Sequence, residues 1–133
     1  MKKVITYGTF DVFHYGHFYL LERAAAYGDH LTVCVSTKDF NLLKGKVSKL
    51  SFAQRCYILQ NISFVDCVIP EETWEQKITD IKRLNIDTFA IGDDHKGKYD
   101  FLKEYCEVIY IPRTKGVCST GIKKLASYSH SRA

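Results

Sequence analysis

The sequence predicts an α/β fold: a doubly wound parallel sheet of five strands with helices on both faces. Short apolar runs alternate with longer amphipathic segments along the 133 residues. A glycine or a proline follows four of the five runs. Strict alternation indicates right-handed crossovers, which place helices on both sides of a parallel sheet.

The first half of the chain supplies two strands and two helices. Gly8 ends the first strand, Gly28 is expected to close the first helix at its C′ position, and Ser51 is expected to cap the second helix. In order, we expect a strand at 4–7, a helix at 15–27, a strand at 31–36 and a helix at 51–61.

The second half continues the alternation. Pro70 and Pro112 are expected to stop strands, and Gly92 to end another. In order, we expect a strand at 65–69, a helix at 74–84, a strand at 88–91, a short helix at 99–105, a strand at 108–111 and a helix at 119–126. Together they predict a single Rossmann-like domain over 1–133, with a loose tail at about 127–133.

Composition excludes several classes of protein. A net charge of +4 is too small for a dense nucleic-acid-binding stripe, so we expect no nucleic-acid partner. No apolar run is long enough to span a bilayer and no export segment begins the chain, so we expect a cytoplasmic protein without a membrane partner. The five cysteines are odd in number and lack C-x-x-C spacing, which favours reduced thiols.

Three clusters of glycine and polar residues follow strands, at 8–17, 92–98 and 112–120. Ligands bind beyond the carboxyl ends of the strands in such sheets. We therefore expect these three segments to converge in space.

The strongest motif runs from Gly8 to His17, with the sequence GTFDVFHYGH. His14 and His17 are three residues apart at the start of a helix, so both can project from one face. Gly16 between them leaves room for a phosphate at the positive helix end. The motif therefore predicts a cradle for a triphosphate.

Other uses of two histidines remain open. A metal site would be expected to have a spacing of four on a helix or a third ligand nearby. A nucleophilic histidine would be expected to have a partner carboxylate at a fixed spacing. A purely structural pair is the third alternative.

The motif G-T-F-D-x-x-H-x-G-H resembles the signature of the cytidylyltransferase-like nucleotidyltransferases. The stretches Trp74-Glu75-Gln76-Lys77 and Arg113-Thr114-Lys115-Gly116 are similar to the bacterial branch that acts on glycerol 3-phosphate. The resemblance implies transfer of CMP from CTP to glycerol 3-phosphate, which gives CDP-glycerol for teichoic acid or capsule synthesis. It also implies a homodimer and Mg²⁺ that arrives with CTP rather than in a protein-built metal site.

The resemblance assigns roles to the histidine motif. His14 and His17 would donate hydrogen bonds to the phosphates of CTP and to the charge of the transition state. Thr9 and Phe10 would line the nucleotide site. Asp11 would either orient the loop or a neighbouring histidine, or cap the helix.

The resemblance also assigns roles to lysines. Segment 41–50 has no strong period and is expected to be a mobile loop that carries two cations, unless it is a solvated run of charges. Lys44 would meet the incoming phosphate monoester, and Lys46 would meet CTP and act in catalysis. Lys77 would also hold the acceptor phosphate.

A second anion cradle is expected after the fifth strand. Arg113, Thr114, Ser119 and Thr120 would bind the nucleotide, with Arg113 also acting in catalysis. Cys118 replaces the serine of the family motif, and a thiol is a poor hydrogen-bond donor.

Two acidic positions complete the predictions. Asp94, with Asp93, would accept from the amino group of cytosine or form a plain turn. Arg55 and Asp66 would pair beneath the site as a structural salt bridge.

Alternative functions remain. The acceptor could be another phosphorylated polyol, phosphocholine or phosphoethanolamine, and the donor could be ATP. A non-catalytic nucleotide-binding regulatory module would bind without turnover, and a thiol-redox or zinc protein would show a reactive cysteine pair or bound metal.

Overall fold

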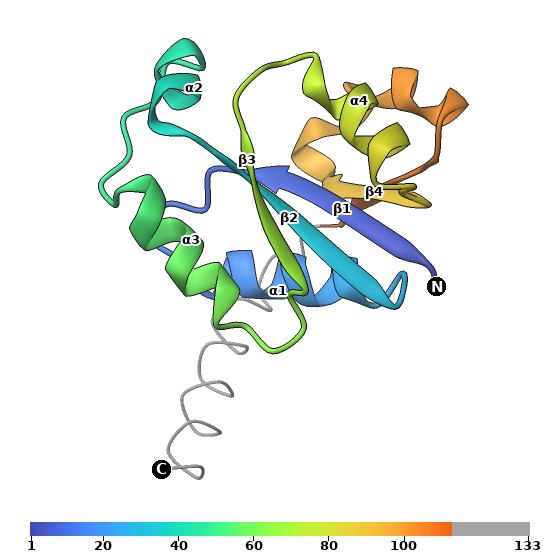
Figure 1. Ribbon diagram of the computed structural model, residues 1–133, viewed down its shortest axis with the longest axis horizontal. Helices are drawn as coiled ribbons and strands as arrows, with labels where there is room; N and C mark the ends of the chain where they lie inside the picture. Colours follow the sequence, from blue (N-terminus) through green and yellow to red (C-terminus); the bar gives the residue numbers. More distant parts are fainter. Residues whose placement is uncertain (113–133) are drawn as a thin grey trace, which may run out of the picture.

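The computed structural model describes residues 1–112. Within them, five parallel strands form a sheet in the order β3-β2-β1-β4-β5 (Figure 1). The strands are β1 (Lys3–Gly8), β2 (His30–Ser36), β3 (Cys67–Glu71), β4 (Thr88–Gly92) and β5 (Glu107–Ile111). The predicted α/β class is therefore confirmed. The helix expected at 119–126 and the tail at 127–133 lie outside the described residues.

Helices cover both faces of the sheet. They are α1 (Tyr15–Ala25), α2 (Lys38–Leu43), α3 (Phe52–Gln60), α4 (Gln76–Arg83) and two 3₁₀ turns, Asp93–His95 and Asp100–Glu104. Figure 1 shows α1 and α3 on one side of the strands and α4 on the other. Within residues 1–112, none of these helices is both long and apolar enough to cross a bilayer.

The central strands are buried on both faces because successive side chains point to opposite sides. Val4 joins the core beneath α1 and α3, whereas its neighbour Ile5 joins the core beneath α4. Both side chains are completely buried. Near-continuous apolar runs such as 4–7 therefore belong in the middle of the sheet.

Of two predicted helix ends, one is confirmed and the other is wrong. Ser51 caps α3 as expected: its Oγ accepts from the Gln54 N–H, and the Gln54 side chain accepts from the Ser51 N–H. Gly28 is not the C′ residue of α1, which ends at Ala25. A Cβ at Gly28 would lie 2.6 Å from the Lys2 carbonyl oxygen, so close backbone approach requires the glycine.

Two expectations about breaks in the pattern are wrong. Pro70 does not stop β3 but lies within it, because β3 is an edge strand and needs no hydrogen-bond partner on its outer side. Segment 41–50 is not irregular throughout, because its first residues complete α2. Thr37 caps that helix by accepting from the Phe40 N–H.

Candidate active site

A cavity of about 840 Å³ lies beyond the carboxyl ends of β1 and β4. The chain leaves β1 in one direction and β4 in the other, so this is the point where the strand order reverses. Segments 8–17 and 92–98 both contribute to its walls, which confirms that they converge. Segment 112–120 is described only as far as Pro112, which also lines the cavity.

The connection from β1 to α1 turns sharply at two unusual residues. Phe10 and Val12 have φ angles of 54° and 42°, in a region that non-glycine residues rarely adopt. The Phe10 ring is buried and would collide with a Cβ at Gly8, whose ideal position lies 2.8 Å from it. Phe10 therefore lines the cavity, as expected, and its ring packs edge-on against His17.

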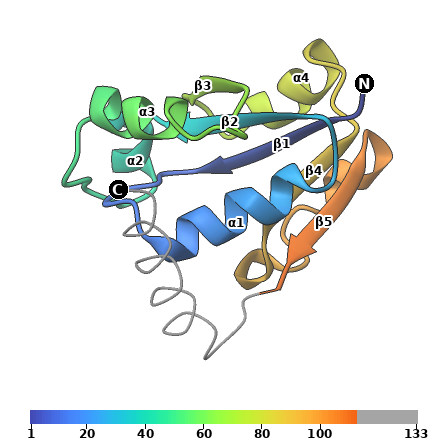
Figure 2. The ribbon, with the colours of Figure 1, turned by 90° about the horizontal axis from the view of Figure 1, so that it is seen from below.

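His14 and His17 lie side by side at the first turn of α1, which begins beside the carboxyl end of β1 (Figure 2). Their rings stack with centroids 3.9 Å apart. His14 Nδ1 accepts from the Gly16 N–H at 3.0 Å, and His17 Nδ1 accepts from the His14 N–H at 3.3 Å. Because each Nδ1 is an acceptor, the neutral rings carry their proton on Nε2.

The environment of His17 keeps it neutral. Burial, with a smaller contribution from the adjacent His14, lowers the pKa of His17 to about 4. The ring is therefore an uncharged donor near pH 7. Both histidines line the cavity, and the hydrogen bonds that hold their rings use Nδ1 and not Nε2.

The loop after α2 is held against the histidine motif by Asp11 and Asn41. The Asp11 carboxylate accepts from the backbone N–H groups of Lys49 and Leu50 at 2.8 and 2.9 Å. These hydrogen bonds lower the pKa of Asp11. Asp11 therefore orients the loop and does not cap the helix, because the cap is His14.

Asn41 also holds this loop through hydrogen bonds, although the sequence analysis did not single it out. Its side chain is buried, accepts from the Thr9 hydroxyl at 3.0 Å and donates to the Ser48 hydroxyl at 2.6 Å. Lys46 donates its backbone N–H to the Asn41 carbonyl at 2.8 Å. Lys46 thus reaches the cavity from an anchored loop.

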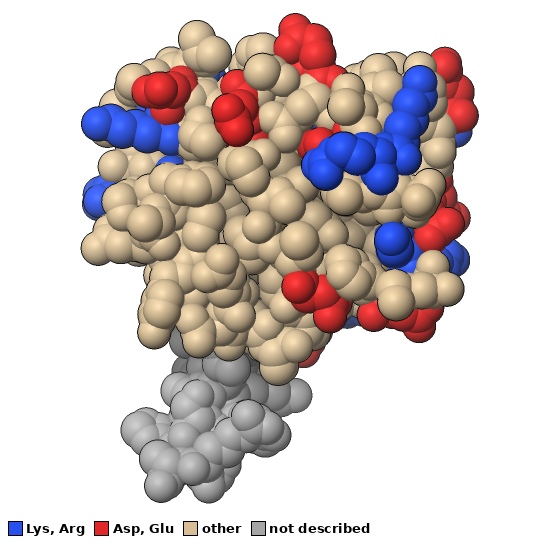
Figure 3. Space-filling model, in the orientation of Figure 1, with Lys and Arg blue, Asp and Glu red and all other residues tan. Residues whose placement is uncertain are grey.

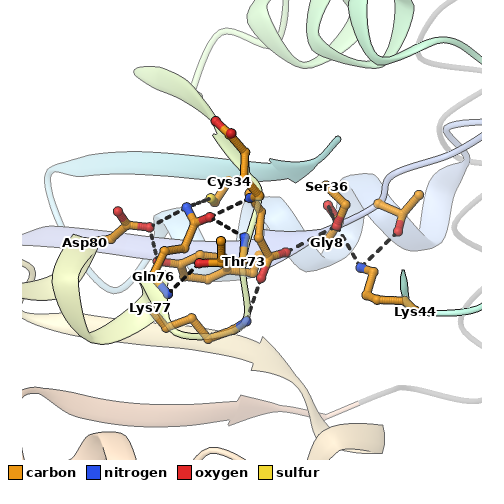
Figure 4. Close-up of polar contacts among 12 residues, drawn as sticks. Gly8, Cys34, Ser36, Lys44, Thr73, Gln76, Lys77 and Asp80 are labelled. Carbon is orange, nitrogen blue, oxygen red and sulfur yellow. Dashed lines mark hydrogen bonds and ion pairs between the residues drawn. The ribbon is translucent and has the colours of Figure 1, made fainter. Parts of the chain in front are cut away.

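Lys44 and Lys77 are not among the residues that line the cavity, and a chain of polar contacts through Ser36 and Glu71 links them (Figure 4). Lys44 Nζ donates to Ser36 Oγ at 2.7 Å and lies 3.3 Å from Thr9 Oγ1. Lys77 Nζ lies 2.6 Å from Glu71 Oε2, and Ser36 Oγ lies 3.2 Å from Glu71 Oε1. Burial lowers the pKa of Lys44.

The sequence analysis missed Ser36 and Glu71. Both stand at the carboxyl ends of their strands, β2 and β3, and this position was the available signal. The proline before Glu71 concealed it, because a strand was expected to stop there.

Arg55 and Asp66 do not pair, so that expectation is wrong. Arg55 NH1 donates to the carbonyls of Thr9 and Ser36 at 3.0 and 2.6 Å. Asp66 instead accepts from the Leu31 N–H at the other end of β2. Arg55 therefore joins the end of β2 to the β1–α1 connection beneath the site.

The acidic residues after β4 also line the cavity. Asp93 and Asp94 form a 3₁₀ turn, and Asp94 Oδ2 lies 3.6 Å from His95 Nε2. Burial lowers the pKa of His95, the one residue of this turn that the sequence analysis did not mention.

Several predictions remain outside the described residues: Arg113, Thr114, Cys118, Ser119 and Thr120. Within residues 1–112, no group of three or more histidine, cysteine or acidic side chains is arranged to hold a metal ion. The four cysteines in that part of the chain are free thiols. Charges of both signs are interspersed on the face seen in Figure 3.

Comparison with known proteins agrees with the motif. The model of the cytidylyltransferase-like family matches residues 5–126. Glycerol-3-phosphate cytidylyltransferase of Bacillus spizizenii is 64% identical over 124 residues, covering 93% of this chain and 96% of the relative. The enzyme of that name from Bacillus subtilis is 57% identical with the same coverage.

A solved structure supports the fold alone. The lipopolysaccharide core biosynthesis protein of Thermoplasma volcanium superposes with a TM-score of 0.77 at 20% identity, covering 86% of this chain and 99% of that one. The family match and the close relatives go further and confirm the resemblance that the histidine motif indicated. The chain belongs to the cytidylyltransferase-like family.

Proposed function

We propose that this chain transfers CMP from CTP to glycerol 3-phosphate and releases CDP-glycerol and pyrophosphate. The observation that carries the proposal is the stacked pair of imidazoles in the wall of the cavity, with Nε2–H donors set by backbone contacts. The names of the close relatives supply the two substrates.

The reaction needs positioning and charge stabilisation but no covalent intermediate. An oxygen of the acceptor phosphate attacks the α-phosphorus of CTP in line, and the bond to the β-phosphate bridging oxygen breaks. Pyrophosphate leaves with that electron pair. His14 and His17 donate to the α- and β-phosphates, where charge develops, and Lys46 neutralises the remaining phosphate charge. Arg113, which lies outside the described residues, is proposed to add a bidentate contact to the phosphates.

The remaining sites are assigned by position. We place the nucleotide on Thr9, Phe10, Asp94, Thr114, Ser119 and Thr120, in addition to the catalytic residues. The acceptor lies toward Lys44 and Lys77, which already share Ser36 and Glu71 as neighbours.

Mg²⁺ is proposed to accompany CTP. The chemistry of the donor set fits this role: the cavity offers imidazole and ammonium donors for phosphate, and Asp11 is committed to the backbone of the loop. When bound, the ion would gather the triphosphate oxygens and reduce their negative charge. Asp93 and Asp94 are the other two carboxylates that line the cavity within residues 1–112, and they would face the water shell of the ion.

The cellular setting is proposed from the same resemblance. A cytoplasmic homodimer would draw on the intracellular pool of CTP, and its product would feed teichoic acid or capsule synthesis. Analytical ultracentrifugation measures the dimer directly: a single species of about 31 kDa is expected, twice the 15.3 kDa of one chain.

The test is a matrix of four nucleoside triphosphates against several phosphorylated acceptors, with pyrophosphate release as the signal. Turnover is expected with CTP and glycerol 3-phosphate. Turnover with ATP and none with CTP would overturn the choice of donor. Nucleotide binding without turnover in any mixture would instead favour a regulatory module.

A further inference from the structure

The ammonium group of Lys77 occupies a closed box of one carboxylate and three aromatic rings. Its Nζ lies 2.6 Å from Glu71 Oε2, and the side chains of the pair are only 5% and 3% exposed. The same Nζ lies 4.9, 5.6 and 6.0 Å from the ring centroids of Tyr7, Tyr99 and Trp74.

This combination is the chemistry by which proteins bind organic ammonium ions. Aromatic faces attract a cation through their quadrupole, and a desolvated carboxylate adds charge. A buried ion pair by itself contributes little net stability compared with apolar residues of similar volume. Stability alone therefore does not explain why a lysine on α4 is buried in such surroundings.

The box adjoins the place where an acceptor would react. Lys44 connects to Glu71 through Ser36, and Lys44 also contacts Thr9, which lines the cavity (Figure 4). An acceptor whose phosphate lies at Lys44 would therefore direct its alcohol portion toward Glu71 and Lys77.

We propose that Lys77 is a built-in cation that fills this box and makes the enzyme reject acceptors with an ammonium group of their own, such as phosphocholine and phosphoethanolamine. The inference rests on the proposed function, because it concerns the acceptor of that reaction. The inference explains selectivity for a neutral polyol phosphate by exclusion of acceptors that carry an ammonium group. Many specific sites distinguish between ligands by excluding the wrong one.

Occupied space produces the exclusion. The Lys77 ammonium is bonded directly to Glu71 and already fills the space beside the three rings, so a second ammonium has neither a free carboxylate nor free ring faces to bind. A hydroxyl does not need this place, because an ammonium with three hydrogens can donate to it.

Lys77→Ala tests the inference by emptying the box. Lys82→Ala is the matched control, because Lys82 is an exposed lysine of the same helix whose Nζ lies over one ring, Tyr105, at 4.9 Å. Choline chloride should raise the melting temperature of Lys77→Ala and leave wild type and Lys82→Ala unchanged. The ratio of kcat/KM for phosphocholine to that for glycerol 3-phosphate should rise by about tenfold or more in Lys77→Ala only.

The binding and kinetic measurements separate the possible failures. A folded Lys77→Ala that does not respond to choline and keeps the wild-type acceptor ratio would overturn the inference. Wild type without turnover on CTP and glycerol 3-phosphate would refute the proposed function, whereas choline binding by Lys77→Ala would still support the box.

A second variant provides the test if Lys77→Ala does not fold. Lys77→Ala leaves Glu71 buried without its partner, so the Glu71→Gln/Lys77→Ala double variant removes that charge and keeps the rings. Tetramethylammonium should stabilise the double variant through the rings, and more weakly than it stabilises a folded single variant. A folded double variant that ignores tetramethylammonium would contradict the inference.

Discussion

At the scale of single residues, the site depends on how the two imidazoles are oriented. His14 and His17 each use Nδ1 to accept a backbone N–H, which leaves Nε2–H for a ligand. The spacing of the motif predicted a shared face. It could not predict the ring stacking or the tautomers, because these depend on the local backbone.

Replacing either histidine by alanine should remove a preorganised donor. His14→Ala and His17→Ala should each lower kcat by about 10²-fold or more, the scale of losing one such group. Pyrophosphate release measures this effect. His30→Ala is the control, because His30 lies at the amino end of β2, whereas the cavity lies beyond the carboxyl ends of the strands. Near-normal turnover in either site variant would remove that histidine from the mechanism.

The low pKa of His17 should make stability depend on pH. The folded-state pKa is about 4, whereas the unfolded chain titrates near 6.5. Between these values the unfolded state binds the additional proton, so acidification from pH 6.5 to 4 should destabilise wild type. His17→Asn lacks this contribution. Urea unfolding at several pH values should therefore give a flatter profile for the variant, and parallel profiles would contradict the assignment.

Gly16 is required by the position of the His14 ring. A Cβ at Gly16 would lie 2.8 Å from His14 Cε1, so Gly16→Ala should displace the ring and lower kcat by about tenfold or more while the fold is kept. Gly97→Ala is the control. It meets no atom within 4 Å but has a φ of 85°, so it should cost about 1 kcal/mol of stability and leave turnover intact. The reverse pattern would be contrary to this account.

At the scale of elements, the loop between α2 and α3 is an anchored part of the site. The Asn41 side chain bonds to Ser48 of the loop, and the Asp11 carboxylate accepts from the backbone N–H groups of Lys49 and Leu50. The sequence predicted a mobile loop with two cations there. It missed α2 because six residues are too few to show a helical period.

Asn41→Ala should loosen that loop. Losing the buried contacts to Thr9 and Ser48 should cost about 1–3 kcal/mol of stability and raise the KM for CTP, because Lys46 is then less well placed. Asn61→Ala is the control, since Asn61 is exposed and donates only to a nearby carbonyl. That control should change the free energy of unfolding by about 0.5 kcal/mol. Equal effects on KM in both variants would argue against the anchoring role.

The strands were easier to predict than the contacts between them. Buried apolar runs marked the positions of β1, β2, β4 and β5 because these strands have few alternatives to the core. Pro70 misled the prediction for β3, since only the sheet order reveals that β3 is an edge. Glu71 was overlooked for the same reason, although it links Lys77 to Ser36.

At the scale of the whole molecule, the sheet order explains why one cavity collects residues from distant segments. The connections after β1 and β4 diverge, and the space between them is walled by residues as far apart as Phe10 and Asp94. The alternation of elements predicted this convergence. The pairing of Arg55 with Asp66 could not be judged in the same way, because it required knowing at which end of β2 each side chain lies.

The central claim is that the triphosphate of CTP binds at the first turn of α1. A crystal structure with CTP tests it most directly. The account predicts phosphate oxygens about 2.7–3.1 Å from Nε2 of both His14 and His17, with Lys46 within reach of the same phosphates. A nucleotide bound elsewhere, or imidazoles turned away from its phosphates, would contradict it.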